Sequence, residues 1–204
     1  MKRRLLALGT VVCLLFGSGF APTAQAQWKA GVAKAVITPK DPLWMAGYGG
    51  RTKVAEGKEM DLFIRVVALE AGDGQRAVIL SSDTLGFPQA IYDVVAERLQ
   101  KEHGLTRAQF VLGASHTHCG PVLRGALYDA YPLTDELIEN INAYSDWFAN
   151  EVVATIGQAL KNLKPAKVSR GVGYTEFGVN RRTNREPDVP MLREQNLLLG
   201  PVDH

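Results

Sequence analysis

Apolar and polar positions predict two strands in the first half of the chain. The segments Leu62–Glu70 and Arg76–Ser82 are rich in β-branched and aromatic residues, and turn residues at positions 71–75 separate them. We therefore expect a hairpin or a closely connected pair of strands. The second segment is almost continuously apolar, which is typical of a central strand that is buried on both faces.

A helical period begins after Asp83. Apolar residues at positions 91, 94, 95 and 99 recur at helical spacing, Pro88 suits a first helical turn, and Gly104 suits a stop. These signals predict a helix from about Pro88 to His103, and Gln109–Ala114 predicts another strand. Strand, helix and strand in about 40 residues form a βαβ unit, which implies parallel strands and a right-handed crossover.

A further helix followed by a strand is predicted in the second half of the chain. Thr134 suits an N-cap, and apolar positions between 137 and 163 keep helical spacings of three and four. This pattern is long for one globular helix, so a break near Asn142–Asp146 is compatible with it. Pro165 would mark the stop, and Lys167–Tyr174 is predicted as the next strand. The predicted class is α/β, a mostly parallel sheet flanked by helices and incomplete at the C-terminus.

The first 26 residues are typical of a secretory signal peptide. Positions 2–4 are basic, positions 5–16 form an apolar run too short to span a membrane, and Ala24-Gln25-Ala26 is a small-residue cleavage pattern. Cys13 lies inside the apolar run, which disfavours a lipoprotein anchor. We expect cleavage after Ala26 and a secreted or periplasmic protein.

Removal of this segment changes the charge balance. The 204-residue chain has a formal net charge of +2, but residues 1–26 contain three basic and no acidic residues, so the remaining 178 residues carry −1. We therefore expect no nucleic-acid partner. The mature chain keeps one cysteine, Cys119, which excludes an internal disulfide. The fold must depend on a packed core, with or without a metal.

Polar side chains follow each of the strands in this series. Asp83 follows the strand at 76–82, His116 and His118 follow the strand at 109–114, and Asn180 with Arg181 follow the third. Ligands of open α/β sheets bind beyond the carboxyl ends of the strands, so we expect these groups to converge.

His116 and His118 carry the strongest chemical signal. Residues i and i+2 of an extended backbone point to the same side, so both imidazoles would face one volume. The pair suits a zinc ion, an acid and a base, or one of each, and the alternative is two surface histidines in a polar turn. The sequence after the pair lacks the Asp-His of metallo-β-lactamase-like hydrolases, and the pair comes too late for the first strand of an amidohydrolase barrel.

Five ordered segments resemble the neutral (non-lysosomal) ceramidases and their bacterial relatives. Residues 114–121, Ala-Ser-His-Thr-His-Cys-Gly-Pro, are similar to the His-Thr-His-Ser-Gly-Pro signature of that family. The other segments are residues 31–39, Met-Ala-Gly-Tyr-Gly at 45–49, residues 82–86, and Val-Asn-Arg at 179–181. The resemblance covers residues 29–204, so residues 27–204 are identified as the N-terminal portion of a ceramidase-like catalytic domain.

The resemblance implies a zinc-dependent amide hydrolase that cleaves N-acylated sphingoid bases, such as ceramide, into a fatty acid and a long-chain amine. It further implies that His116 is a zinc ligand, that His118 hydrogen-bonds in the active site, and that Arg181 is the active-site arginine. Without the resemblance, Arg181 would be assigned to a solvated basic run. A lipid amide substrate would also bring peripheral contact with membrane lipid, and Trp44, Met45 and Tyr48 are candidates for an apolar groove. The oligomeric state is not indicated.

Two features depart from the family pattern. Cys119 stands where the family has serine, and would be a third soft ligand, a nucleophile, or a simple replacement in the turn. The other zinc ligands of the family, a histidine, a glutamate and a tyrosine, lie beyond the matching stretch, and neither His103 nor His204 suits the second histidine. We therefore expect the N-terminal part of a longer enzyme with an incomplete site. The alternative is a secreted, non-catalytic binding domain that retains the fold.

Overall fold

The computed structural model describes residues 28–175 and 178–200. The chain divides between Lys167 and Val168 into two compact units, each of which is described by itself. The predicted signal peptide and His204 lie outside the described residues. Among the helices of the described ranges, none combines the length and the apolar character needed to cross a membrane.

The first unit is built on a mixed five-stranded sheet with the strand order β4-β3-β2-β1-β5. The strands are β1 (Trp28–Val36), β2 (Phe63–Glu70), β3 (Arg76–Ser82), β4 (Phe110–Ala114) and β5 (Lys164–Ala166). In this sheet β3 and β4 form the one parallel pair, and all other neighbours are antiparallel. The α/β class and the hairpin are thus confirmed. The expected mostly parallel sheet is wrong, because one crossover helix yields only one parallel pair.

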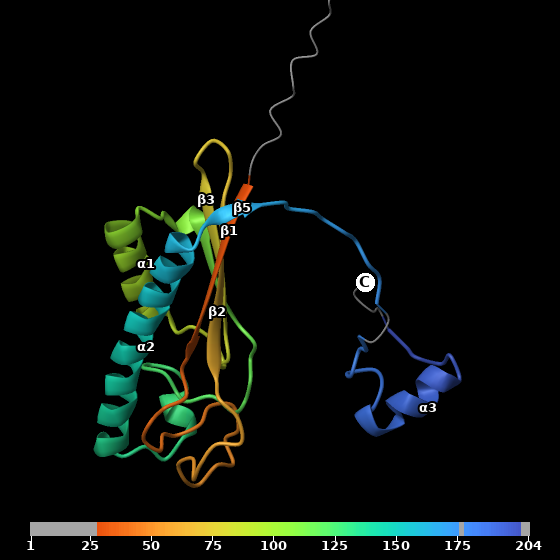
Figure 1. Cartoon of the computed structure of the whole chain (residues 1–204). Helices are drawn as coiled ribbons and strands as arrows, with labels where there is room; N and C mark the ends of the chain where they lie inside the picture. The colour runs from red at the N-terminus through yellow and green to blue at the C-terminus, as the bar shows by residue number, and fades with distance from the viewer. Residues whose placement is uncertain (1–27, 176–177, 201–204) are drawn as a thin grey trace, which may run out of the picture. The chain divides into compact units, whose positions relative to one another are not determined.

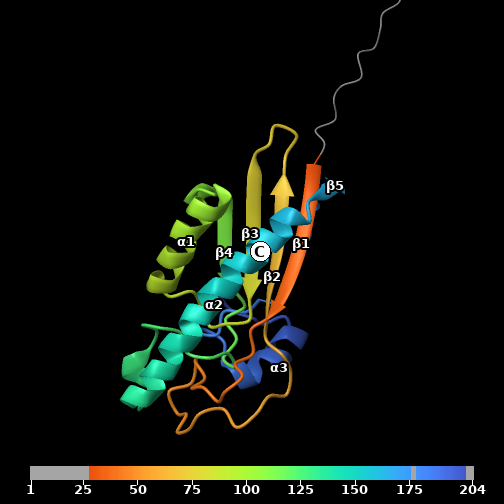
Figure 2. The ribbon, with the colours of Figure 1, turned by 60° about the vertical axis from the view of Figure 1, so that its left-hand side comes forward.

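Two helices cover one face of this sheet (Figures 1 and 2). Helix α1 (Gln89–His103) connects β3 to β4 and ends at Gly104, whose left-handed φ of 68° closes the last turn. Helix α2 (Asp135–Lys161) begins after Thr134, whose side chain accepts a hydrogen bond from the Leu137 N–H. Both predicted helices are confirmed. Helix α2 is continuous through residues 142–146, so the break that its length suggested does not occur.

The main core lies between the helices and the near face of the sheet. Ile64, Val66 and Leu80 pack there against Phe148 and Ile156 of α2, and all five are at most 1% exposed. The far face of the sheet carries exposed apolar residues, and the strand register places Val32, Val67, Ile79 and Val111 in one row across four strands. Strand β3 is therefore buried on one face, and the expectation of burial on both faces is wrong.

The predicted strand Lys167–Tyr174 is also wrong. After α2 the chain returns to the outer edge of β1, where β5 pairs antiparallel with the start of β1. Pro165 lies in β5, which is consistent with the preference of proline for edge strands. Residues 167–174 have no regular secondary structure.

The second unit contains a short 3₁₀ turn (Glu186–Asp188) and helix α3 (Val189–Glu194). Asn184 is 2% exposed and organises this unit. Its Nδ2 donates to the carbonyls of Asn180 at 2.7 Å and Leu199 at 2.8 Å, and its Oδ1 accepts from the Leu199 N–H at 2.9 Å.

Candidate active site

The carboxyl ends of β3 and β4 lie side by side because these two strands are parallel. The Ser115 N–H donates to the Ser82 carbonyl at 2.9 Å, which extends the ladder by one residue. The turn that carries His116 therefore lies next to the segment that follows Asp83. The segments that follow β3 and β4 are thus adjacent, as expected, but the Asp83 carboxylate turns to Phe63 and Arg65 and does not join the histidines.

His116 is held by a hydrogen bond between its ring and the backbone. Its Nδ1 lies 2.8 Å from the Leu85 carbonyl oxygen. A carbonyl oxygen only accepts, so Nδ1 carries a proton, and in the neutral ring Nε2 then has the free lone pair. The His116 backbone has a left-handed φ of 57°, which is uncommon for a residue with a side chain. His116 is exposed, so this turn presents the Nε2 side of the ring to the surroundings.

His118 lies beside His116, with the ring centroids 5.1 Å apart and the planes at 71°. The sequence placed both rings on one side of extended backbone, but a turn brings them together here. His118 is half-buried, and its Nδ1 is fully enclosed with no hydrogen-bond partner. A Cβ on Gly47 would lie 2.8 Å from that Nδ1, so the Gly47 backbone closes this side of the ring.

The segment of residues 44–46 runs alongside the residues that follow the histidines. The Ala46 N–H donates to the Gly120 carbonyl, and the Val122 N–H donates to the Trp44 carbonyl, both at 2.8 Å. Trp44 and Ala46 are buried in a second apolar cluster, completed by Val122, Tyr131 and Ile141. Trp44 is thus a core residue and does not line an open groove, whereas Tyr48 is 58% exposed.

Two residues near the histidines were missed in the sequence. Nη2 of Arg51 donates to the His118 carbonyl at 2.6 Å, and the Tyr131 hydroxyl accepts from the Gly47 N–H at 2.8 Å. The available signal for Arg51 was its place directly after the Gly-Tyr-Gly-Gly segment. Tyr131 is 84 residues from Gly47, and the sequence holds no signal for that contact.

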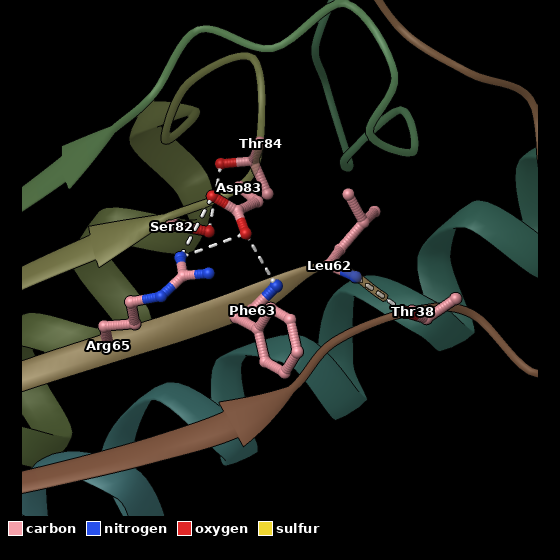
Figure 3. Close-up of polar contacts among 7 residues, drawn as sticks. All are labelled: Thr38, Leu62, Phe63, Arg65, Ser82, Asp83 and Thr84. Carbon is pink, nitrogen blue, oxygen red and sulfur yellow. Dashed lines mark hydrogen bonds and ion pairs between the residues drawn. The ribbon is translucent and has the colours of Figure 1, made fainter. Parts of the chain in front are cut away.

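Asp83 is engaged with the sheet (Figure 3). Its carboxylate accepts from the Phe63 N–H at 2.9 Å and pairs with Nη1 of Arg65 at 3.1 Å. Thr38 supports the same end of β2, because its hydroxyl accepts from the Leu62 N–H at 2.8 Å. These contacts connect β3 to the start of β2 and give Asp83 a structural role.

Arg181 and Asn180 belong to the second unit. The Arg181 side chain is 68% exposed and pairs with Glu186 at 2.9 Å. Asn180 is used locally, since its Oδ1 accepts from the Arg182 N–H at 2.9 Å. These contacts lie within the second unit.

A zinc ion beside the histidines would need about three protein ligands. His116 fits a zinc ligand through its free Nε2, because a ligating imidazole commonly donates its other nitrogen to a carbonyl. Cys119 is exposed, and its N–H donates to the Thr117 hydroxyl at 3.2 Å. In residues 28–175 and 178–200, no three side chains of His, Cys, Asp or Glu form a group that could hold a metal ion. Cys119 therefore does not complete a three-ligand set with the histidines.

The fold and the site define an α/β protein with paired imidazoles at the carboxyl ends of two parallel strands. The profile of the family described as neutral/alkaline non-lysosomal ceramidase, N-terminal, matches residues 28–186, so the chain belongs to this family. Neutral ceramidase B of Dictyostelium discoideum is 30% identical over 151 residues, which are 70% of this chain and 20% of that protein.

Two solved structures share the fold. The neutral ceramidase of Pseudomonas aeruginosa matches with a TM-score of 0.56 and 24% identity, and a ceramidase complexed with C2 matches with a TM-score of 0.56 and 26% identity. Each match covers 69% of this chain and 22% of the solved chain. The chain thus spans about a fifth of the length of the relatives it matches.

Proposed function

We propose that this chain supplies part of the active site of a zinc-dependent ceramidase, which hydrolyses N-acylated sphingoid bases to a fatty acid and a sphingoid base. The observation that carries this proposal is the bond of the His116 ring to the Leu85 carbonyl, which leaves Nε2 ready to bind a metal. Membership of the ceramidase family supports the reaction class. The match to a ceramidase complexed with C2 supports a ceramide-like substrate.

The proposed mechanism divides the work among three residues. Zinc, when bound, polarises an amide carbonyl and lowers the pKa of bound water to about 7. His116 would hold the ion through Nε2, and the Leu85 carbonyl fixes the tautomer and the ring orientation. His118 would hydrogen-bond to the reacting amide from the adjacent position. Arg181 would stabilise negative charge on the amide oxygen.

The substrate class has consequences for the surroundings of the site. A protein that acts on ceramide must take a lipid from a membrane or a micelle, so we propose peripheral contact with lipid. From the signal-peptide pattern of residues 1–26 we further propose cleavage after Ala26 and a secreted or periplasmic location. A pocket of about 310 Å³ lined in part by Met45, Arg51 and Val54 lies on the segment that contacts His118. Its lining combines apolar side chains with Arg51 and with the ion pair of Lys53 and Glu56, so it offers both apolar and polar contacts to a lipid amide.

A zinc titration tests the assignment of His116. We expect the purified chain to bind zinc weakly, because a catalytic zinc site has three protein ligands and the described residues offer no such group. His116→Ala should weaken zinc binding by about tenfold or more, since the loss even of an outer partner costs that much. The matched control is His103→Ala, which removes an imidazole at the end of α1. Equal zinc affinity in His116→Ala and the unmodified chain would refute the assignment.

Hydrolysis of ceramide by the same preparation tests whether the site is complete. We expect poor turnover from the 204-residue chain. Full turnover that a chelator abolishes would contradict the proposal that this chain holds only part of the site.

A secreted, non-catalytic binding domain is the second candidate function. The lack of a three-ligand group among residues 28–175 and 178–200 favours it. This candidate predicts that ceramide-containing vesicles bind the chain equally with and without zinc, and that His116→Ala leaves the binding unchanged. A requirement for zinc or for His116 in lipid binding would exclude it.

A further inference from the structure

Tyr48, Arg51 and His118 form a closed set of contacts. Nη2 of Arg51 donates to the His118 carbonyl at 2.6 Å, and the Arg51 guanidinium carbon lies 5.3 Å from the centroid of the Tyr48 ring. The Tyr48 ring in turn meets the His118 ring in an edge-to-face arrangement, with the centroids 4.7 Å apart. Arg51 thus holds the main chain of His118, while Tyr48 holds its ring.

The segment that carries Tyr48 and Arg51 is fixed at both of its ends. Ala46 is hydrogen-bonded to Gly120 on the amino side, and on the carboxyl side the Ala55 N–H donates to the Leu43 carbonyl at 2.9 Å. Within the loop, the Arg51 N–H donates to the Tyr48 carbonyl at 3.3 Å. This anchoring sets the position of both side chains against His118.

The burial of these groups indicates a role other than core packing. Tyr48 is 58% exposed, so its ring contributes little to the apolar core. Nε of Arg51 is buried without a hydrogen-bond partner, an arrangement that costs stability. An exposed aromatic ring and an incompletely satisfied guanidinium are poor stabilisers, yet both contact a residue next to the metal-binding imidazole.

We propose that Tyr48 and Arg51 are positioning residues that hold the His118 ring beside His116. This inference rests on the proposed function, in which His118 hydrogen-bonds to the reacting amide. Two interactions carry it: a charge-assisted hydrogen bond, stronger than a neutral one, and the contact of a planar cation with the aromatic ring that meets His118. Lysine is a poor replacement for Arg51, because an ammonium is not planar and cannot lie over the Tyr48 ring while it donates to the His118 carbonyl as the guanidinium does.

Nuclear Overhauser contacts between ring protons test the positioning directly on the purified chain without metal. We expect cross-peaks between the rings of His118 and His116 and between those of His118 and Tyr48. Both should be lost in Arg51→Lys, because the guanidinium that holds the His118 carbonyl and lies over the Tyr48 ring is gone. In Tyr48→Leu the His118–His116 cross-peak should be lost, whereas Tyr48→Phe should restore it because it keeps the ring.

The matched control is Lys53→Ala, which removes a neighbouring cation of the same loop. Lys53 pairs with Glu56 at 2.7 Å, and its side chain is 66% exposed. We expect the His118 cross-peaks of this variant to equal those of the unmodified chain. If Arg51→Lys does not fold, Tyr48→Leu still provides the test, because the Tyr48 side chain is largely exposed. A persistent cross-peak between His118 and His116 in Tyr48→Leu would overturn the proposal.

The readouts separate this inference from the proposed function. Ring contacts of His118 are measured without zinc, whereas the metal assignment rests on the zinc titration of His116→Ala. If the cross-peaks are lost in the Arg51→Lys and Tyr48→Leu variants but zinc affinity is unchanged in His116→Ala, the positioning of His118 is upheld and the zinc site is refuted. Retained cross-peaks together with zinc binding that needs His116 would refute the positioning alone.

Discussion

Gly47 is the position where a single methyl group should disturb the site most. Its φ of 110° is rarely adopted by residues with a side chain, and an added Cβ would overlap the His118 ring. We expect Gly47→Ala to lower the free energy of unfolding by about 1–3 kcal/mol, the range for a residue forced into such a conformation. Urea unfolding measures this loss.

Gly49 is the matched control, since it lies two residues away in the same loop. A Cβ there meets nothing within 4 Å, and its φ is not positive. Gly49→Ala should change the free energy of unfolding by less than about 0.5 kcal/mol. Equal effects of the two substitutions on the free energy of unfolding would show that the close approach of Gly47 to His118 does not contribute to stability.

At the scale of the elements, β3 offers a test of the two-layer arrangement. Leu80 faces the helices and is 1% exposed, whereas its neighbour Ile79 faces away and is 53% exposed. We expect Leu80→Ala to cost about 2–5 kcal/mol of unfolding free energy, because it leaves a cavity in the core. Ile79→Ala removes a similar volume and should cost less than half as much. Similar losses, measured by urea unfolding, would contradict burial of β3 on one face only.

The elements that the sequence predicts correctly have large inward-facing side chains. Strands β2 and β3 and helices α1 and α2 carry periodic Leu, Ile, Val or Phe, and each was predicted within a few residues. Strand β1 was missed as an element because its inward positions are Gly31, Ala33 and Ala35. A Cβ on Gly31 would overlap the backbone of α2, so close helix packing demands the small residues that hide the strand pattern.

The topology was predicted only where a local connection determines it. The crossover from β3 through α1 to β4 gives the parallel pair, as expected. The prediction of a further parallel strand after α2 is wrong, because the chain returns to β1 and forms an antiparallel edge strand there. The antiparallel pairing of β1 with β2 joins segments that a long loop separates. Local hydrophobic spacing does not predict which distant strand a given strand will pair with.

In the candidate site, too, contacts between residues close in sequence could be predicted, whereas long-range contacts could not. The short spacing of His116 and His118 was sufficient to predict that their rings meet, although a turn rather than a strand brings them together. Asp83 was expected near them, and it instead pairs with Arg65 across the sheet. Arg51 contacts His118 from 67 residues away in the chain, a long-range contact that spacing alone does not predict.

On the scale of the whole molecule, Glu70 joins three strands at one end of the sheet. Its carboxylate pairs with Lys29 of β1 at 2.8 Å and with Arg76 of β3 at 2.9 Å. Hydrogen bonds from Lys29 and then from Arg76 hold the pKa of Glu70 below its usual value of 4.5. Two further carboxyls have a lowered pKa for similar reasons: Asp61 beside Lys58 and Thr38, and Glu102 beside Arg98.

These lowered pKa values predict that acid destabilises the fold. A carboxyl whose pKa is lower in the folded state contributes stability above its unfolded pKa, and that contribution disappears as the pH falls through the folded pKa. We therefore expect the urea midpoint to be constant near neutral pH and to fall once the pH drops below about 4.5, the ordinary glutamate value. In Glu70→Gln the urea midpoint should be lower at neutral pH, and the further fall in acid should be smaller, because one of the three carboxyls no longer titrates.

Glu56→Gln is the matched control, since Glu56 forms a single exposed ion pair within a loop, and this substitution should leave the pH profile unchanged. A Glu70→Gln profile that runs parallel to that of the unmodified chain at every pH would contradict the role of Glu70 in joining the three strands.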